Sequence, residues 1–226
     1  MFINTNRRKS ELYSKGNECL VMDLGDIISL NTIVSEECMT ALKKAVRKMS
    51  YKKDECIVQQ GIVNTNMYFF SKGMCRLTIK SNGEESTVLF NSGEGDVFFS
   101  VSSLLHGKPS VFSIYALEST ELWVLDNKSF VDISTRFPEL KIWMCNLLMV
   151  QLYGLEQHYL RFGKTSPWER FKNYMQNYSH NNRRYISSEN SYKKIPLKYI
   201  AQYLGITQST LSHFRNDYFQ SLRDKK

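Results

Sequence analysis

The stretch IPLKYIAQYLGITQSTLSHFRNDYF at residues 195–219 shows most directly what the chain can form. Pro196 stands at a first helical position, ahead of apolar residues at the i, i+3, i+4, i+7 spacing of one helix face: Leu197, Ile200, Ala201 and Leu204. Gly205 then provides a left-handed stop, and Thr207 is a good N-cap for a second helix. That helix carries apolar residues toward the first at Leu211, Phe214 and Tyr218. The pattern predicts a helix-turn-helix.

The opposite face of the second predicted helix carries amide, hydroxyl and imidazole groups that can donate to or accept from base edges in the major groove. These predicted base-reading residues are Gln208, Ser209, Ser212 and His213. Contacts to the DNA backbone are expected from Thr207, Lys198, Arg215, Lys193 and Lys194. The competing interpretation is an ordinary helical hairpin with a polar outer face.

The positive charge of the chain lies at its C-terminal end. The net charge is +8, and residues 163–226 carry 12 Lys and Arg against 4 Asp and Glu. Residues 1–162 carry 18 of each class and cancel. A neutral body with a basic end is typical of a polyanion-binding protein, although a solvated Lys-rich tail has the same composition.

The central part of the chain has the pattern of an antiparallel barrel or jelly roll. Residues 51–126 form short runs rich in β-branched and aromatic residues, separated by glycines. Asn82-Gly83 predicts a type I′ turn between Cys75–Ile79 and Glu85–Phe90. Helices are expected at 35–49, 128–137, 139–161 and, behind an N-cap at Ser166, 167–178.

The long helix expected at 139–161 is apolar around much of its circumference, which indicates burial on two sides. A homodimer contact is the predicted second partner, and a helix buried within one chain is the alternative. The residues assigned to this dimer helix are Trp143, Leu147, Val150 and Leu155.

These elements define an α+β chain with four predicted segments. They are an N-terminal extension (1–30), a jelly-roll domain (31–137), a long dimerisation helix (138–162) and a winged-helix-like helix-turn-helix domain (163–226). Runs at 184–187 and 191–195 are the candidate wing hairpin; otherwise the wing is absent.

The five cysteines (Cys19, Cys38, Cys56, Cys75 and Cys145) are scattered and form no C-x-x-C pair. We therefore expect reduced, mostly buried thiols in a cytoplasmic protein, with neither metal nor cofactor. The sequence contains neither a run of about 20 apolar residues nor a signal-peptide pattern, so no membrane association is expected. A Ser-His-Asp or clustered His arrangement is also missing from the sequence, which argues against an enzyme.

The order of jelly roll, long helix and helix-turn-helix resembles the Crp/Fnr family of bacterial transcription regulators, over about residues 30–220. The most specific stretches are Gly95–Phe98, Leu104–Ser110, Ala116–Glu118 and Ile195–Arg215. The resemblance implies a homodimer that senses a signal in the jelly roll and binds a near-palindromic site on double-stranded DNA. A contact with RNA polymerase is a further implication.

The sequence departs from this family where cyclic nucleotides are bound. Members that bind them carry a Gly-Glu pair for the ribose and an Arg-Ala pair for the phosphate. Phe99 and Ser100 stand at the first pair, and Ser110 and Val111 at the second. The resemblance therefore implies a degenerate effector pocket that does not bind cyclic AMP in the usual manner. The thiols also lack the spacing of an iron–sulfur centre.

Two other interpretations remain open at this point. The chain could be a small-molecule-binding or cupin-like jelly roll whose helical tail serves oligomerisation; cupin metal sites need clustered His and Glu ligands. It could also be a regulator without any small ligand, controlled by its abundance or by a protein partner.

Overall fold

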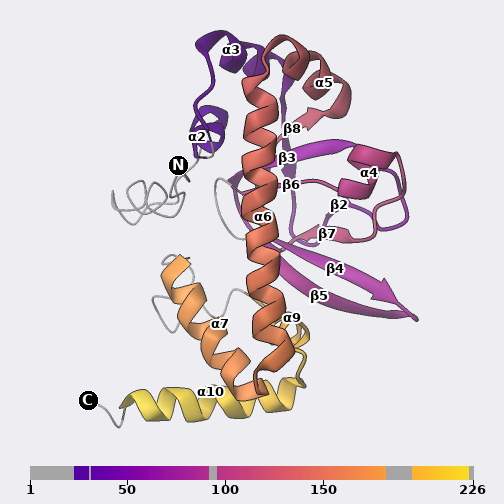
Figure 1. The fold of residues 1–226 in the computed structure, drawn as a ribbon. Coiled ribbons are helices and arrows are strands. Elements are labelled where there is room, and N and C mark those ends of the chain that lie inside the picture. The colour runs from indigo at the N-terminus through magenta and orange to yellow at the C-terminus, as the bar shows by residue number, and fades with distance from the viewer. Residues whose placement is uncertain (1–22, 31, 92–95, 182–194, 224–226) are drawn as a thin grey trace. The chain divides into compact units, whose positions relative to one another are not determined.

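The computed structural model describes residues 23–30, 32–91, 96–181 and 195–223 (Figure 1). The chain divides into two compact units. The first comprises Met1–Ile79 and Phe90–Gly154, and the second comprises Lys80–Leu89 and Leu155–Lys226. The chain therefore passes between the units at three points.

Two four-stranded antiparallel sheets form the body of the first unit, which confirms the predicted β-roll. One sheet has the order β1–β8–β3–β6 and the other β2–β7–β4–β5. The strands are β1 (Arg47–Tyr51), β2 (Cys56–Val58), β3 (Asn66–Lys72), β4 (Cys75–Ser81), β5 (Glu84–Asn91), β6 (Val97–Phe98), β7 (Ser113–Ala116) and β8 (Thr120–Asp126).

Strand β3 shows how period-2 alternation produces two separate cores. Tyr68 and Phe70 point into a cluster to which both sheets contribute, together with Phe98, Ile114 and Leu122. The intervening Met67 and Phe69 point the other way, into a cluster of buried residues shared with the helices, which we call the helical-layer core. One strand therefore supplies side chains both to the sheet interior and to the helical layer.

Four described helices of the first unit begin at side-chain caps. They are α2 (Leu24–Ser29), α3 (Glu36–Ala45), α4 (Val101–His106) and α5 (Asn127–Arg136), capped by Asp23, Ser35, Ser100 and Asp126 respectively. Each cap side chain accepts a hydrogen bond from a backbone N–H of the first turn, which is otherwise unpaired in a helix.

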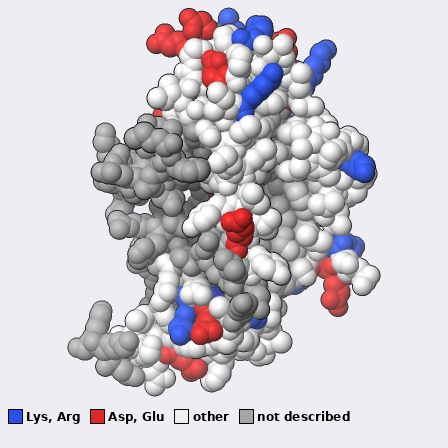
Figure 2. Space-filling model, viewed as in Figure 1, with Lys and Arg blue, Asp and Glu red and all other residues white. Residues whose placement is uncertain are grey.

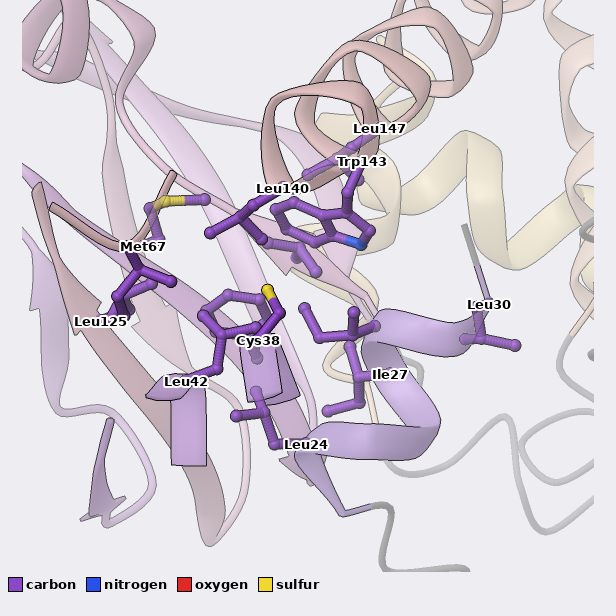
Figure 3. Packing of buried hydrophobic residues seen from close by; sticks show 14 of the residues in the cluster. Leu24, Ile27, Leu30, Cys38, Leu42, Met67, Leu125, Leu140, Trp143 and Leu147 are labelled. Atoms are coloured by element: carbon purple, nitrogen blue, oxygen red, sulfur yellow. The ribbon is translucent and has the colours of Figure 1, made fainter. Parts of the chain in front are cut away.

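Helix α2 lies at the end of the predicted N-terminal extension (1–30) and packs against the first unit. Asp23 and Asp26 make a reciprocal capping box at its start. Its Leu24, Ile27 and Ile28 are buried in the helical-layer core (Figure 3). A six-residue helix is too short to show a clear 3.6-residue periodicity, so the sequence pattern missed it.

The predicted helix at 35–49 is shorter in the structure. Helix α3 ends at Ala45, because Val46 is its extended C-cap. Met49 lies in β1, opposite Leu122 of β8. The apolar spacing of Met39, Leu42 and Val46 suits a helix, but backbone pairing with β8 outweighs it from Arg47 onward.

Helix α6 (Glu139–Lys164) is the long helix predicted from the sequence. Its Leu140, Trp143 and Leu147 are buried in the helical-layer core (Figure 3). Burying one aromatic or aliphatic side chain of this size stabilises the fold by about 1.5–3 kcal/mol.

The second unit contains α7 (Pro167–Asn181), α9 (Leu197–Leu204), α10 (Gln208–Arg223) and the hairpin tip at residues 80–89. Ser166 caps α7 as predicted, with its Oγ accepting from the backbone N–H of Glu169 at 3.2 Å. The hairpin turn is also confirmed, since Asn82 and Gly83 both have positive φ, 51° and 85°. The candidate wing at 184–195 lies almost wholly outside the described residues.

Candidate nucleic-acid interface and effector region

The turn between α9 and α10 has the predicted geometry. Gly205 has φ 63°, and its N–H donates to the carbonyl of Gln202 at 3.1 Å. The N–H of Ile206 donates to the carbonyl of Ala201 at 3.0 Å. Glycine suits this left-handed position because it has no Cβ. Pro196 is the N-cap of α9 rather than its first helical residue, a shift of one position from the prediction.

Arg170 of α7 fixes the same turn, a role that sequence reasoning did not find. Its Nε donates to the carbonyl of Leu204 at 3.0 Å, and its Nη1 donates to the carbonyl of Thr165 at 2.9 Å. One guanidinium thus satisfies a C-terminal carbonyl of α9 and a carbonyl before α7. The residue lies 35 positions upstream of the turn glycine, so no local pattern could reveal it.

Helix α10 begins at a side-chain cap, as predicted. The Oγ1 of Thr207 accepts from the N–H of Thr210 at 3.1 Å and lies 2.8 Å from the Oγ of Ser209. Leu211 is buried against the turn side of the helix. Phe214 and Tyr218 contact Phe171 of α7, with ring centroids 5.9 and 5.8 Å away, a partner that the sequence pattern did not predict.

The four predicted base-reading side chains are all exposed along α10: Gln208, Ser209, Ser212 and His213. His213 Nε2 lies 3.6 Å from a carboxylate oxygen of Asp217, one turn later. This arrangement leaves a continuous row of polar groups facing solvent from a helix whose other side packs on α7 and α9.

The predicted backbone-contacting residues are only partly within the described structure. Lys198 is exposed on α9, while Arg215 is half-buried on α10. Lys193 and Lys194 lie outside the described residues. The same holds for much of the positive charge of the C-terminal segment, including Arg183 and Arg184.

We call the two stretches that contain the predicted pocket residues, 99–100 and 110–111, the effector region. Its first stretch forms the start of helix α4. Ser100 is buried and caps α4, with its Oγ accepting from the N–H of Ser103 at 3.4 Å. The same hydroxyl lies 3.1 Å from the Oγ of Ser102. Phe99 is buried in the helical-layer core. Both residues therefore have structural roles where nucleotide-binding members carry a ribose contact.

The second part of the effector region folds back on its own backbone. The Oγ of the buried Ser110 donates to the carbonyl of Phe112 at 2.8 Å. The Ser110 backbone exchanges hydrogen bonds with Gly61 and Ile62, at 2.8 and 3.0 Å. Val111, the other residue assigned to this part of the pocket, is 60% exposed.

The space between the two sheets is occupied by aromatic side chains near this region. Tyr68 stacks on Phe98 with ring centroids 4.8 Å apart, and Phe70 lies 5.4 Å from the same ring. The Tyr68 hydroxyl is held by the amide of Asn64 at 2.9 Å. An apolar, aromatic interior favours an uncharged occupant over a phosphate, whose burial requires a paired cation.

The predicted dimer-helix residues fall into two groups. Trp143 and Leu147 are buried in the core of their own unit, so they are not available to a second copy and this part of the prediction needs correction. Val150 and Leu155 are exposed. The helix has two apolar faces as predicted, but Trp143 and Leu147 belong to the inward one.

The described cysteines are free thiols of two kinds. Cys38 and Cys75 are buried, whereas Cys56 and Cys145 are exposed, so the expectation of mostly buried thiols holds for half of them. Burial, followed by the charge of Glu139, raises the pKa of the Cys38 thiol to about 11. Burial likewise raises the pKa of Cys75. Cys19 lies outside the described residues.

Within the described ranges, no group of three His, Cys, Asp or Glu side chains is placed to hold a metal ion. Among the helices that the structure describes, none combines the length and apolar character needed to cross a bilayer.

Part of the chain is similar in sequence to known proteins. Residues 48–136 match the cyclic nucleotide-binding domain model. A cAMP-dependent protein kinase regulatory subunit from Dictyostelium discoideum is 25% identical over 97 residues, which cover 43% of this chain and 29% of that protein. The chain thus spans less than a third of the length of this relative.

Solved structures share the fold over more of the chain. FixK2 from Bradyrhizobium japonicum has a TM-score of 0.65 at 20% identity, over 78% of this chain and 85% of its own. A CooA variant from Carboxydothermus hydrogenoformans has a TM-score of 0.64 at 20% identity, over 91% and 88%. The c-di-GMP-responsive regulator CLP of Xanthomonas campestris has a TM-score of 0.67 at 8% identity, over 83% and 93%.

Residues 48–136 therefore resemble a cyclic nucleotide-binding domain in sequence. The fold that surrounds them is the one seen in Crp/Fnr-type regulators, and the resemblance expected from the sequence is confirmed at that level.

Proposed function

We propose that the chain is a DNA-binding transcriptional regulator of the Crp/Fnr type that binds a near-palindromic site as a homodimer. The observation that carries the proposal is the exposed polar row of α10, presented by a helix that Thr207 caps and whose entry turn Arg170 fixes. A helix of this kind fits the major groove, where amide and hydroxyl groups distinguish base pairs. The proposal assigns the chain no catalytic role.

Side-chain chemistry indicates which residues would contact bases and which would contact phosphates. Gln208, Ser209, Ser212 and His213 would read base edges. Contacts to phosphates would come from Thr207, Lys198, Arg215, Lys193 and Lys194, which fix the orientation of the helix without reading sequence. A contact with RNA polymerase is part of the same proposal.

The homodimer is proposed to form through the outward face of α6. Ile142, Cys145, Met149 and Leu152 are exposed and follow the 3–4–3 spacing of a helix–helix seam. This face lies opposite Trp143 and Leu147, which the protomer uses for its own core. Figure 2 shows that few charged side chains lie over this helix. An exposed, largely uncharged stripe on a long helix is typical of a protein–protein contact.

Control by cyclic AMP in the usual manner of the family is not part of this proposal. Ser100 and Ser110 are buried and bonded within their own loops, and neither can neutralise a phosphate. We propose that the regulator acts without a small ligand or responds to an uncharged one.

The test is selection of bound fragments from a random-sequence duplex pool by the purified full-length protein. We expect an enriched motif with two inverted half-sites whose centres lie about one helical turn apart. Binding to that motif should weaken as salt rises, because counterions are released from phosphates. A matched selection from a single-stranded pool should give no motif. Failure to enrich any duplex sequence would overturn the proposal.

A further inference from the structure

Residues 80–89 form the tip of a hairpin and belong to the second unit, whereas the other ends of both strands, before Lys80 and after Leu89, belong to the first. β4 enters the tip after Ile79, and β5 leaves it before Phe90. The tip is held by a turn at Asn82-Gly83, which fixes the register of the two strands. The second unit is therefore built from two separate stretches of sequence.

Within the second unit, the Gln202 side chain of α9 binds this hairpin tip through both of its polar atoms. Its Nε2 donates to the carbonyl of Glu85 at 2.8 Å, and its Oε1 accepts from the Oγ1 of Thr87 at 2.9 Å. Glu85 and Thr87 are two residues apart on β5, a spacing at which strand groups repeat on one side. We call this pair of hydrogen bonds the Gln202 clasp.

Burial makes the clasp energetically significant. Thr87 is 2% exposed, so its hydroxyl cannot exchange a lost protein partner for bulk water. Gln202 is half-buried and sits in the last turn of α9. Its own carbonyl accepts the N–H of Gly205 at 3.1 Å, so the residue that holds the hairpin also closes the turn into α10.

The other end of the hairpin lies next to the effector region. Thr78 of β4 pairs with Ser113 of β7, and Leu77 pairs with Ile114. Ser113 follows directly on the loop in which Ser110 bonds to Phe112. A conformational change in that loop would therefore be transmitted through β7 to Thr78 of β4, two residues before the chain enters the second unit at Lys80.

We propose that the Gln202 clasp is a positioning contact through which the hairpin fixes α9, and with it the presentation of α10. The hairpin completes the second unit and gives the effector region a covalent route to it that does not pass along α6. The consequence for DNA rests on the proposed function; the mechanical consequence for α9 does not.

The test compares three variants of the full chain by hydrogen exchange: Thr87→Val, which keeps the shape and removes the hydroxyl, Gln202→Leu, and the double variant. Thr87→Val removes one of the two hydrogen bonds, and we expect about five-fold faster exchange of the α9 amides, the population shift expected when one buried neutral hydrogen bond is lost. Gln202→Leu removes both bonds and should speed the exchange at least as much. The double variant should exchange about as fast as Gln202→Leu, because that single variant already removes both hydrogen bonds of the clasp. Protection of β1 and β8 should stay unchanged and would report intact folding.

Two matched controls sharpen the result. Ser86→Ala, at an exposed neighbour on β5, should leave α9 protection unchanged. Thr87→Ser keeps the hydroxyl and should therefore show the same protection of the α9 amides as the parent protein. If Thr87→Val and Gln202→Leu exchange like Ser86→Ala, the clasp does not position α9 and the inference is overturned.

A second measurement uses the duplex selected with the parent protein. Thr87→Val should bind that duplex about five-fold more weakly, while Ser86→Ala binds it as the parent does. Faster α9 exchange with unchanged affinity for the duplex would overturn the coupling to DNA. If the parent selects no duplex, the proposed function fails, and the exchange experiment still decides the mechanical part.

Discussion

The indole ring of Trp143 stacks on Phe69 with ring centroids 5.8 Å apart, which joins the long helix α6 to the outer face of β3. Both side chains are fully buried in the helical-layer core. Their contact explains how one helix can be apolar on two sides. The inward side is needed for the stability of the protomer, and the outward side remains open to a partner.

The two sides of α6 should respond differently to truncation. Trp143→Ala should lower the free energy of unfolding by about 3–5 kcal/mol, because it removes a large buried ring and leaves a cavity. Ile142→Ala, at the adjacent exposed position, should change the unfolding of the isolated protomer by less than about 0.5 kcal/mol. Urea denaturation at low protein concentration measures both. Equal losses would mean that Ile142 also belongs to the protomer core.

The proposed seam places Cys145 near its own copy in a parallel pair of α6 helices. Mild oxidation with a copper–phenanthroline catalyst and dioxygen should remove two electrons and two protons from the paired thiols. The product is a disulfide-linked dimer on a non-reducing gel. Cys145→Ser should abolish that product, whereas Cys56→Ser, at the other exposed thiol, should not. A dimer by light scattering that never cross-links through Cys145 would point to a different register.

Gln208 and His213 are expected to read bases rather than phosphates. Replacing both by Ala should relax sequence preference, with a loss of about 1–3 kcal/mol for each good base contact on the selected duplex and little change on random DNA. Lys198→Ala is the matched comparison, since it should weaken binding to all duplexes and lower the salt dependence. Fluorescence anisotropy at several salt concentrations separates the two patterns. A uniform loss in the Gln208 and His213 variant would assign these residues to the phosphates.

Calorimetry with cyclic AMP should give no saturable heat with the full-length protein. The physical reason is that Ser100 and Ser110 supply neither a carboxylate for the ribose nor a cation for the phosphate, and their hydroxyls are already bonded. A clear saturable heat would show that another group binds the phosphate, and the account of the effector region would have to change.

The buried Cys38 thiol should make stability fall in alkali. Its pKa is raised in the folded protein to about 11, mainly by burial, so the unfolded chain loses this proton first as pH rises. The contribution is fully present below the ordinary thiol pKa and is lost as pH rises through the folded value. Cys38→Ala should therefore show a smaller decline in unfolding free energy between about pH 9 and 11. An identical decline in both proteins would assign it to other groups.

Local sequence patterns were sufficient to predict the positions of the turns and the helix caps. Asn82-Gly83, Ser166, Gly205 and Thr207 each act through atoms within a few residues, and the structure places each where expected. The antiparallel β-roll followed from the same kind of local alternation.

Features that depend on distant partners were missed or misplaced. The sequence shows that α6 is apolar on two sides, but not which side Trp143 occupies, because that choice depends on Phe69 in a distant strand. Arg170 and Gln202 hold groups far away in the chain, and neither stands in a recognisable motif. The end of α3 at Ala45 depends on the pairing of β1 with β8.

The assignment of Lys80–Leu89 to the second unit also bears on how such a protein can be divided or recombined. A fragment that begins at Leu155 contains every helix of that unit from α7 onward but lacks the strand to which α9 is bonded. Exchanging C-terminal halves between relatives would likewise separate Gln202 from the Thr87 with which it is matched. The second unit is therefore not one transferable piece of sequence, and an exchange that preserves it must carry the hairpin with it.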